Sequence, residues 1–177
     1  MIFLLSGESG SGKTNLLNEL AVILRIHKLV PGGFTAPGSW LNGVRSGFVL
    51  HDLFHNNQYP LAETGGTGPE MQGHFVFNEK TLEVGNQLLI SQHTDPGIDI
   101  IIVDEVGPFE LRGKGWARSL DILAASGKPQ IWAVRPQLAD RISDRWKLTP
   151  SFSFYVNENN PVSVFGRISD LCFNQKQ

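Results

Sequence analysis

The sequence includes Gly7-Glu8-Ser9-Gly10-Ser11-Gly12-Lys13-Thr14, which matches the phosphate-binding pattern G-x-x-x-x-G-K-[ST] at every fixed position. The flanking residues supply the context that this pattern requires. Residues 1–5 are a short apolar run of the buried-strand type, and from Thr14 onward leucine and isoleucine recur at helical spacing. We therefore interpret residues 7–14 as a phosphate-binding loop (a P-loop, or Walker A motif) and not as a glycine-rich turn before a helix.

The residue types of this 7–14 loop predict its chemistry. Its glycines, Gly7 included, can adopt backbone angles barred to other residues, so that successive N–H groups point at one anion. The loop opens a helix, whose positive dipole end adds to the same field. We expect Lys13 to reach the β- and γ-phosphates of a nucleotide and the Thr14 hydroxyl to ligate Mg²⁺, with Asn15 completing the nucleotide site.

Length and charge narrow the class of partner. A chain of 177 residues is expected to form one domain over residues 1–177. Its formal net charge of -2 argues against a sequence-independent grip on nucleic acid, which needs many excess Lys and Arg contacts to phosphates. We therefore expect a small-molecule partner, a nucleotide, and no nucleic acid. The sequence does not identify a protein partner.

Cysteine content and hydropathy bear on the compartment. Cys172 is the only cysteine, which excludes an internal disulfide framework and a cysteine-based metal cluster and favours a reducing cytosol. The apolar run at residues 1–5 is too short for a signal segment, and no other run approaches the length needed to span a membrane. We expect a soluble, cytoplasmic protein without membrane contact.

Hydrophobic periodicity predicts an α/β chain. The segments with clear patterns are a helix over 13–27, a β-hairpin within 36–50, a strand at 74–77, a helix from 78 to about 93, a central strand over 98–105, a helix over 116–126, a strand over 130–134 and a helix over 138–146. This alternation predicts a mostly parallel sheet covered by helices on both faces.

Three segments are harder to interpret. Pro31-Gly32-Gly33 is predicted to prevent the first helix from continuing, and a strand is predicted to begin at Phe34. Residues 55–73 are polar and glycine-rich and are interpreted as a flexible loop. Residues 151–168 alternate like edge strands around a turn at 157–161.

The central strand predicts the second half of the site. Asp104 ends it, at the edge of the sheet where ligands of open α/β folds bind, and is expected to hold Mg²⁺ as a Walker B carboxylate. Glu105 follows and is placed to deprotonate an attacking water. The alternative is that both carboxylates only end a strand before a turn.

Four basic residues follow the two inner strands. Arg135 ends the strand at 130–134, which we expect between the loop strand and the metal strand, and its cation is positioned to stabilise charge on a transferred phosphoryl group. A surface arginine before Pro136 is the alternative. Arg112, Lys114 and Arg118 are interpreted as a solvated basic face and not as a phosphate lid.

Four stretches resemble the small P-loop nucleoside-triphosphatases first described from thermophiles, a family that also occurs in animals and includes a cancer-related member. They lie within roughly residues 1 to 135 and are the 7–14 loop, Gly33-Phe34 with Arg45-Ser46-Gly47-Phe48, the segment Phe77-Asn78 to Leu82-Glu83, and Asp104-Glu105-Val106-Gly107 with Glu110-Leu111.

This resemblance implies a RecA-like, three-layer α/β fold. It also implies slow, Mg²⁺-dependent hydrolysis of nucleoside triphosphates such as ATP or GTP to diphosphates, with broad base specificity. It makes Glu105 the catalytic base and Arg45 a residue that faces the site. The chain departs from the family pattern at Pro37-Gly38-Ser39-Trp40, where members commonly carry an acidic pair and an arginine, and at Pro108, where a lysine is common.

Two other functions are compatible with the same loop. A small-molecule kinase would transfer the phosphoryl group to an acceptor under a water-excluding lid, although the segment 55–73 is poor in arginine. A binding module would use the nucleotide to switch its contacts with a partner.

Trp40 is the one tryptophan whose glycine-flanked turn suggests stacking on a base.

Overall fold

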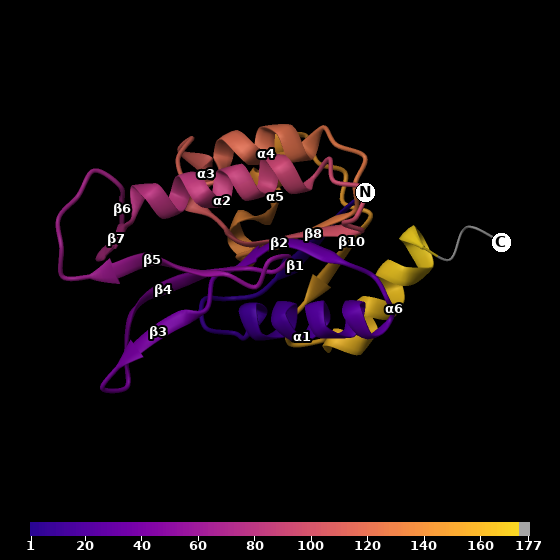
Figure 1. Ribbon diagram of the computed structural model, residues 1–177, viewed down its shortest axis with the longest axis horizontal. Helices are drawn as coiled ribbons and strands as arrows, with labels where there is room; N and C mark the ends of the chain where they lie inside the picture. Colours follow the sequence, from indigo (N-terminus) through magenta and orange to yellow (C-terminus); the bar gives the residue numbers. More distant parts are fainter. Residues whose placement is uncertain (174–177) are drawn as a thin grey trace.

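One ten-stranded sheet between helices organises the computed structural model, which describes residues 1–173 (Figure 1). The strands are β1 (Ile2–Ser6), β2 (Pro31–Thr35), β3 (Gly38–Leu41), β4 (Val44–Asp52), β5 (Gln58–Thr64), β6 (Met71–Gln72), β7 (Phe75–Phe77), β8 (Ile100–Val106), β9 (Gln130–Val134) and β10 (Phe152–Tyr155). Their spatial order is β10-β1-β9-β8-β2-β4-β5-β7-β6, with β3 paired to β4.

The helices are α1 (Lys13–Ile26), α2 (Glu79–Gln92), α3 (Pro108–Leu111), α4 (Ala117–Ala124), α5 (Ala139–Trp146) and α6 (Pro161–Cys172), with a 3₁₀ turn η1 (Pro136–Leu138). Helices α1 and α6 pack together on one face of the sheet, and α2, α4 and α5 cover the other (Figure 1). The α/β class is confirmed, and the strand β9 lies between β1 and β8 as expected.

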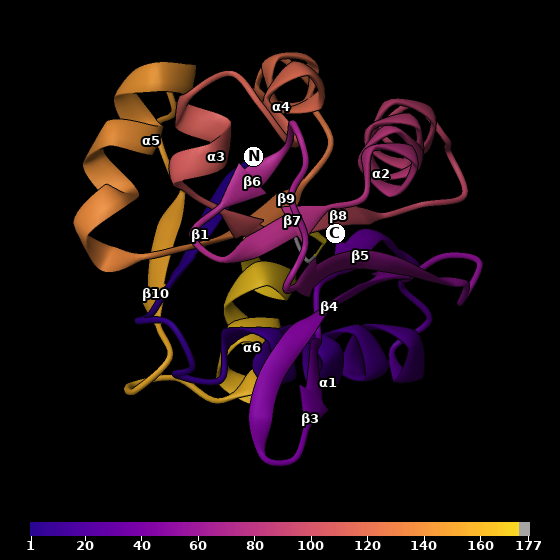
Figure 2. The ribbon, with the colours of Figure 1, turned by 90° about the vertical axis from the view of Figure 1, so that its left-hand side faces the viewer.

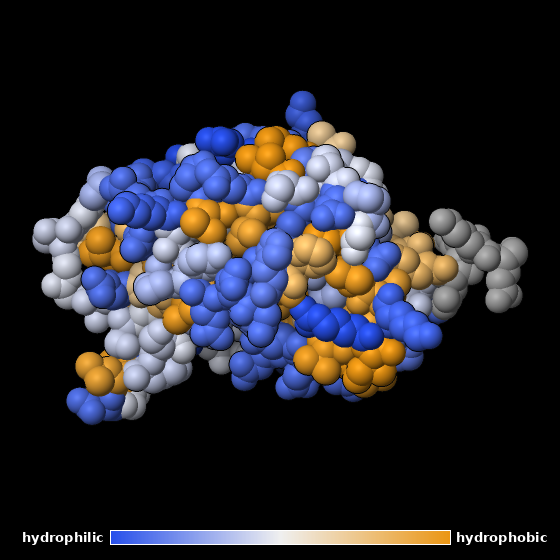
Figure 3. All heavy atoms as spheres, in the orientation of Figure 1, coloured by the Kyte–Doolittle hydropathy of each residue, from blue (hydrophilic) through white to orange (hydrophobic). Residues whose placement is uncertain are grey.

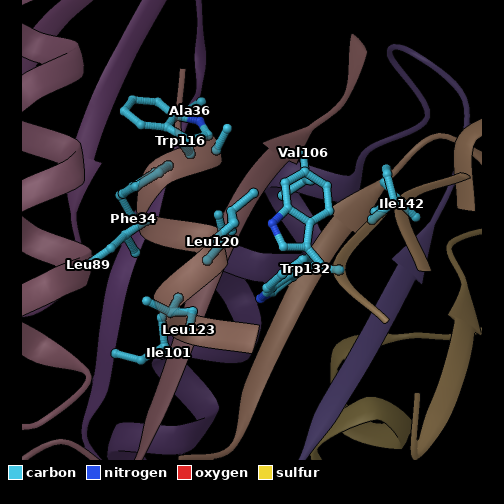
Figure 4. Close-up of a cluster of buried hydrophobic side chains, with 14 of the residues drawn as sticks. Phe34, Ala36, Leu89, Ile101, Val106, Trp116, Leu120, Leu123, Trp132 and Ile142 are labelled. Atoms are coloured by element: carbon cyan, nitrogen blue, oxygen red, sulfur yellow. The ribbon is translucent and has the colours of Figure 1, made fainter. Parts of the chain in front are cut away.

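Strand alternation divides the interior into two apolar cores. Strands β10, β1, β9, β8 and β2 run parallel, and successive side chains of a strand point to opposite faces. In β9, Ile131 and Ala133 pack toward α1 and α6, whereas Trp132 and Val134 pack toward the α4 and α5 side. Figure 4 shows the second core, where Trp132 lies among residues of the sheet and the covering helices.

An antiparallel extension continues the sheet beyond β2. Strand β4 pairs with β2, β3 and β5, and β7 joins β5 to β6. The hairpin predicted within 36–50 is confirmed, but the flexible loop predicted over 55–73 is wrong, because residues 58–64 form β5. Pro60 lacks the N–H that a regular ladder needs, and the strand tolerates it at a register shift opposite Val49.

The first helix ends before Pro31-Gly32-Gly33 as predicted, but the predicted strand start at Phe34 is wrong, because these three residues begin β2. Gly33 has a φ of +80°, and a Cβ there would lie 2.0 Å from the carbonyl oxygen of Ile102 in β8. The glycine therefore permits a close approach between two buried strands. Sequence alone shows the glycine and the proline but not the neighbouring strand that explains them.

The C-terminal segment was predicted as edge strands and is half helix. Residues 152–155 form the parallel edge strand β10, but residues 161–172 form α6. Asn160 caps this helix, because its side chain accepts a hydrogen bond from the N–H of Ser163 at 2.9 Å, and Pro161 occupies the first helical position. The predicted turn is present at residues 156–158, but it leads into a helix and not into a second edge strand.

Other local predictions are confirmed. Asn78 caps α2 through a hydrogen bond from the N–H of Thr81, α1 ends one residue before the expected His27, and β9 has the predicted bounds. The short helix α3 was missed. No helix within residues 1–173 is long and apolar enough to cross a membrane.

Replacing Asn160 with alanine is expected to lower the free energy of unfolding by about 1 kcal/mol, because the first turn of α6 loses its side-chain cap. Urea denaturation followed by circular dichroism measures this. Asn157→Ala, in the same turn but outside the cap, is the control. Equal losses in the two variants would contradict the capping role.

Candidate active site

The 7–14 loop connects β1 to α1 at the carboxyl edge of the parallel strands, the edge that faces the viewer in Figure 2. Gly10 and Gly12 have φ values of +78° and +97°, which other residues rarely adopt. Gly7 does not have a positive φ, so the expectation is wrong for that residue. A Cβ at Gly7 would instead lie 2.5 Å from Ser11 Oγ and 3.2 Å from side-chain atoms of Lys13 and Val156, so a small residue is favoured there for space.

Lys13 begins α1 and is 4% exposed. Its Nζ donates hydrogen bonds to the carbonyl oxygens of Gly7 at 2.8 Å and Glu8 at 2.9 Å. Burial lowers the pKa of Lys13, and the carboxylates of Glu105 and Asp104 oppose that shift. The ammonium group is therefore held over the loop, close to two carboxylates that come from the end of β8.

Asp104 is fully buried at the end of β8. Its Oδ2 accepts hydrogen bonds from Thr14 Oγ1 at 2.7 Å and from the N–H of Ala36 at 3.0 Å. Burial, followed by the neighbouring Glu105 carboxylate, raises the pKa of Asp104 to about 6. A hydroxyl beside a carboxylate is an all-oxygen donor pair that fits Mg²⁺, which commonly takes one or two protein ligands.

A β-bulge directs Glu105. Pairing between β8 and β9 shifts register between Val103 and Val106, where three steps along β8 oppose two along β9. Glu105 lies in this interval with a φ of +59°, a left-handed conformation that is unfavourable for a non-glycine residue. Bulges next to active sites turn a side chain out of the strand pattern. Sequence reasoning placed Glu105 after the strand but could not show the bulge.

Two cavities meet at Glu105. The smaller, of about 260 Å³, lies between the start of α1 and the β3–β4 hairpin, and its lining includes Lys13, Thr14, Asn15 and Trp40. The larger, of about 370 Å³, extends under β6 and β7. The residues that line both are Ala36, Arg45, Phe48 and Glu105.

The two arginines expected at the site lie in these cavities. Arg45, on β4, lines both, and its guanidinium lies over the rings of Trp40 at 5.0 Å and Phe48 at 5.4 Å. Arg135 follows β9 and lines the larger cavity beside Ser9. Both cations thus border the space that also contains Glu105.

The basic residues after β8 do not line either cavity. Arg112, Lys114 and Arg118 are exposed. Lys114 instead pairs with Glu70 at 3.1 Å, which links the α3–α4 connection to the segment before β6. This agrees with a solvated basic face.

Comparison with known proteins identifies the family. The model of the family NTPase_1, described as NTPase, matches residues 2–169. The nucleoside-triphosphatase THEP1 of Archaeoglobus fulgidus is 32% identical over 160 residues, 88% of each chain, and that of Methanothermobacter thermautotrophicus is 27% identical over 97% of this chain and 95% of the other. The chain belongs to this nucleoside-triphosphatase family. The resemblance noted from the 7–14 loop and the Asp104 segment is thereby confirmed.

Solved structures share the fold of this nucleoside-triphosphatase. A human cancer-related nucleoside triphosphatase has a TM-score of 0.72 at 20% identity, covering 99% of this chain and 98% of that one. THEP1 from the hyperthermophile Aquifex aeolicus has a TM-score of 0.73 at 20% identity, covering 98% of this chain and all of that one. The likeness therefore extends through α6, well beyond the motifs in the first 135 residues.

The sequence did not indicate which residues form the walls of the larger cavity, or that Glu110 is buried with a raised pKa. Aromatic side chains from separate elements form those walls. The sequence places Phe48, Phe75 and Phe77 in predicted strands but does not show that they meet Phe109 and Trp116. Glu110, on α3, is 2% exposed and accepts hydrogen bonds from the N–H groups of Gly107 at 2.8 Å and Trp116 at 3.4 Å. Burial raises the pKa of Glu110 to about 7.

Glu105→Gly is expected to be more stable than Glu105→Ala by about 1 kcal/mol, because alanine keeps the cost of the left-handed conformation and glycine removes it. Elsewhere in a strand the order is the reverse. Urea midpoints of both variants measure this difference, with the pair Val103→Gly and Val103→Ala as control. A more stable alanine variant at position 105 would contradict the conformational strain.

Glu110→Gln is expected to weaken the pH dependence of folding. The pKa of Glu110 rises from 4.5 to about 7 on folding, so its stabilising contribution is fully present below pH 4.5 and is lost as the pH rises through 7. Between about pH 4.5 and 8, the variant should lose less unfolding free energy than wild type, by at most about 3 kcal/mol. Urea titrations across that range measure it. Glu63→Gln, at an exposed position, should match wild type.

Proposed function

We propose that this nucleoside-triphosphatase hydrolyses nucleoside triphosphates to diphosphate and inorganic phosphate in a Mg²⁺-dependent reaction with broad base specificity. The observation that carries the proposal is the position of Glu105. The bulge in β8 turns this carboxylate out of the strand, and it lines both cavities next to the buried Lys13 and the Thr14–Asp104 pair.

In this proposal the 7–14 loop binds the phosphates. The left-handed Gly10 and Gly12 curl the backbone so that its N–H groups converge on an anion, and α1 adds its dipole. Lys13 would exchange its bonds to the loop carbonyls for bonds to phosphate oxygens. Thr14 and Asp104 would hold Mg²⁺, which neutralises negative charge on the β- and γ-phosphates when bound.

Glu105 acts as the general base. A water molecule on the side of the larger cavity gives a proton to the Glu105 carboxylate as its oxygen bonds to the γ-phosphorus. The bond from that phosphorus to the bridging oxygen breaks, and its electron pair stays on the diphosphate. Arg135 and Arg45, which border the same space, are positioned to stabilise charge on the transferred group.

Broad base specificity is supported by the hairpin. Trp40 lines the smaller cavity with the 7–14 loop, and it is 61% exposed. Figure 3 shows apolar atoms gathered at the projecting tip of this hairpin, where Leu41 and Val44 are also exposed. A tryptophan that stacks on a base accepts every base, because each has a π face.

The single cysteine, Cys172, favours the cytoplasm as the site of this reaction.

Glu105→Gln is expected to bind nucleotide as wild type does and to release phosphate about 100-fold more slowly, because it keeps the shape of the side chain and loses the base. Lys13→Ala should lose both binding and turnover. Phosphate release from ATP, GTP, CTP and UTP with Mg²⁺, with nucleotide binding measured separately, tests both. Values of kcat/KM within about tenfold for the four nucleotides would support stacking as the mode of base binding.

Glu63→Gln is the matched control, because Glu63 is exposed on β5 and outside both cavities. It should hydrolyse all four nucleotides at the wild-type rate. Undiminished turnover by Glu105→Gln would remove Glu105 from the role of base, and wild type that binds nucleotide without releasing phosphate would sink the proposed reaction.

A further inference from the structure

Much of the larger cavity is built from parts of the chain that supply nothing to the proposed hydrolytic site. Strands β5 to β7 supply one wall, and α2, α3 and the segment before α4 supply another. Figure 2 shows β6 and β7 on the face of the molecule that carries the 7–14 loop. Glu105 and Arg135 lie on its lining together with Ser9 of that loop. The cavity therefore opens onto the position from which a nucleophile would reach the γ-phosphate.

Its size exceeds what hydrolysis requires. A water molecule occupies roughly 30 Å³ in the liquid, whereas the cavity measures about 370 Å³. That volume falls within the range of about 300–1,000 Å³ typical of small-molecule sites. A site that only positions one water molecule does not need a cavity of this size beside its general base.

Aromatic pairs form much of the wall. Phe48 and Phe75 meet edge to face with ring centroids 4.9 Å apart, and Phe77 and Phe109 stack at 5.0 Å. Trp116 and two leucines add further apolar surface. Walls of this kind hold water poorly and favour a flat ring system, which gains both apolar burial and ring contacts.

Two residues of this lining, Arg45 and Gln72, each have a buried side-chain atom without a hydrogen-bond partner. The amide oxygen of Gln72, on β6, is buried and accepts no hydrogen bond, although Gln72 lines the cavity. An unpaired buried acceptor is unfavourable, and native structures contain few of them. A ligand with an N–H or O–H group on its ring would satisfy this oxygen once the Gln72 amide turns toward the cavity.

The charges around the cavity nearly cancel. Its charged lining residues are two arginines, Arg45 and Arg135, and two glutamates, Glu105 and Glu110. Both arginines also belong to the proposed phosphate chemistry, so no cation is left over for an anionic second ligand. The lining therefore fits an uncharged molecule.

We propose that the larger cavity binds a neutral heteroaromatic alcohol, of nucleoside size or smaller, which accepts the γ-phosphoryl group in place of water. The inference rests on the proposed function, because it uses the same phosphate site and the same base. It adds a second substrate and a second product.

The transfer forms one bond to the γ-phosphorus and breaks another. The hydroxyl oxygen of the acceptor bonds to the γ-phosphorus and its proton moves to the Glu105 carboxylate. The bond between that phosphorus and the bridging oxygen breaks, and its electron pair leaves with the nucleoside diphosphate. The products are a phosphomonoester of the acceptor and a nucleoside diphosphate, so inorganic phosphate no longer accounts for the triphosphate consumed.

The first experiment measures binding. Adenosine, guanosine, cytidine, uridine and pyridoxine are titrated into the full chain with ADP and Mg²⁺ present, by calorimetry. At least one is expected to bind with a Kd below about 1 mM. Gln72→Leu, which removes the unpaired acceptor at nearly constant volume, should weaken that binding about fivefold or more. Gln58→Leu, at an exposed position on β5, should leave binding unchanged.

The second experiment measures transfer. Wild type is incubated with ATP, Mg²⁺ and the bound probe, and mass spectrometry is expected to find the phosphorylated probe in an amount equal to the ADP formed less the phosphate released. Glu105→Gln should bind the probe without phosphorylating it. Failure of all five probes to bind, equal affinities in the Gln72 and Gln58 variants, or binding without transfer would each overturn the inference.

Phosphate release without any probe, in the same samples, tests the proposed hydrolysis separately. Release without probe binding would leave the hydrolase and remove the acceptor site. Formation of phosphorylated probe without basal phosphate release would leave the acceptor site and remove the proposed hydrolysis.

Discussion

The carboxylate of Asp104 ties together the elements that form the site. It is fully buried, and a buried carboxylate must be hydrogen-bonded or it costs several kcal/mol. Its bonds come from Thr14 in the first turn of α1 and from the backbone of Ala36 just after β2. The 7–14 loop, β2 and β8 therefore share one anchor, and the position of Lys13 over the strand ends follows from it.

Features set by local pattern were predictable from sequence. The 7–14 loop, the buried strands β8 and β9 and the cap at Asn78 each depend on a few consecutive residues. Features set by distant partners were not. Strand β5 depends on β4, and Gly33 depends on the close approach of β8. The larger cavity depends on side chains from seven helices and strands, so no short stretch of sequence could predict it.

Glu105 breaks a local rule at the point where the chemistry is proposed. A left-handed glutamate inside a buried strand is unfavourable by about 1–2 kcal/mol, and glycine would fit better. The surrounding sheet holds it there, because the nearest paired positions on either side of the bulge, Val103 and Val106, remain paired with β9. Such strain at a charged residue is typical of functional sites, where geometry and not local preference decides the residue.

The antiparallel extension is joined to the parallel sheet by a narrow connection. Strand β4 pairs with β2 only at Phe34 and Thr35, whereas it pairs with β5 over five positions. The extension also contacts α2, α3 and the loop after α3, through Thr81–Pro60, Phe77–Phe109 and Lys114–Glu70. Regions held by few backbone pairs open more easily than the interior of a sheet. Opening of this extension would uncover the larger cavity and leave the 7–14 loop, between β1 and α1, folded.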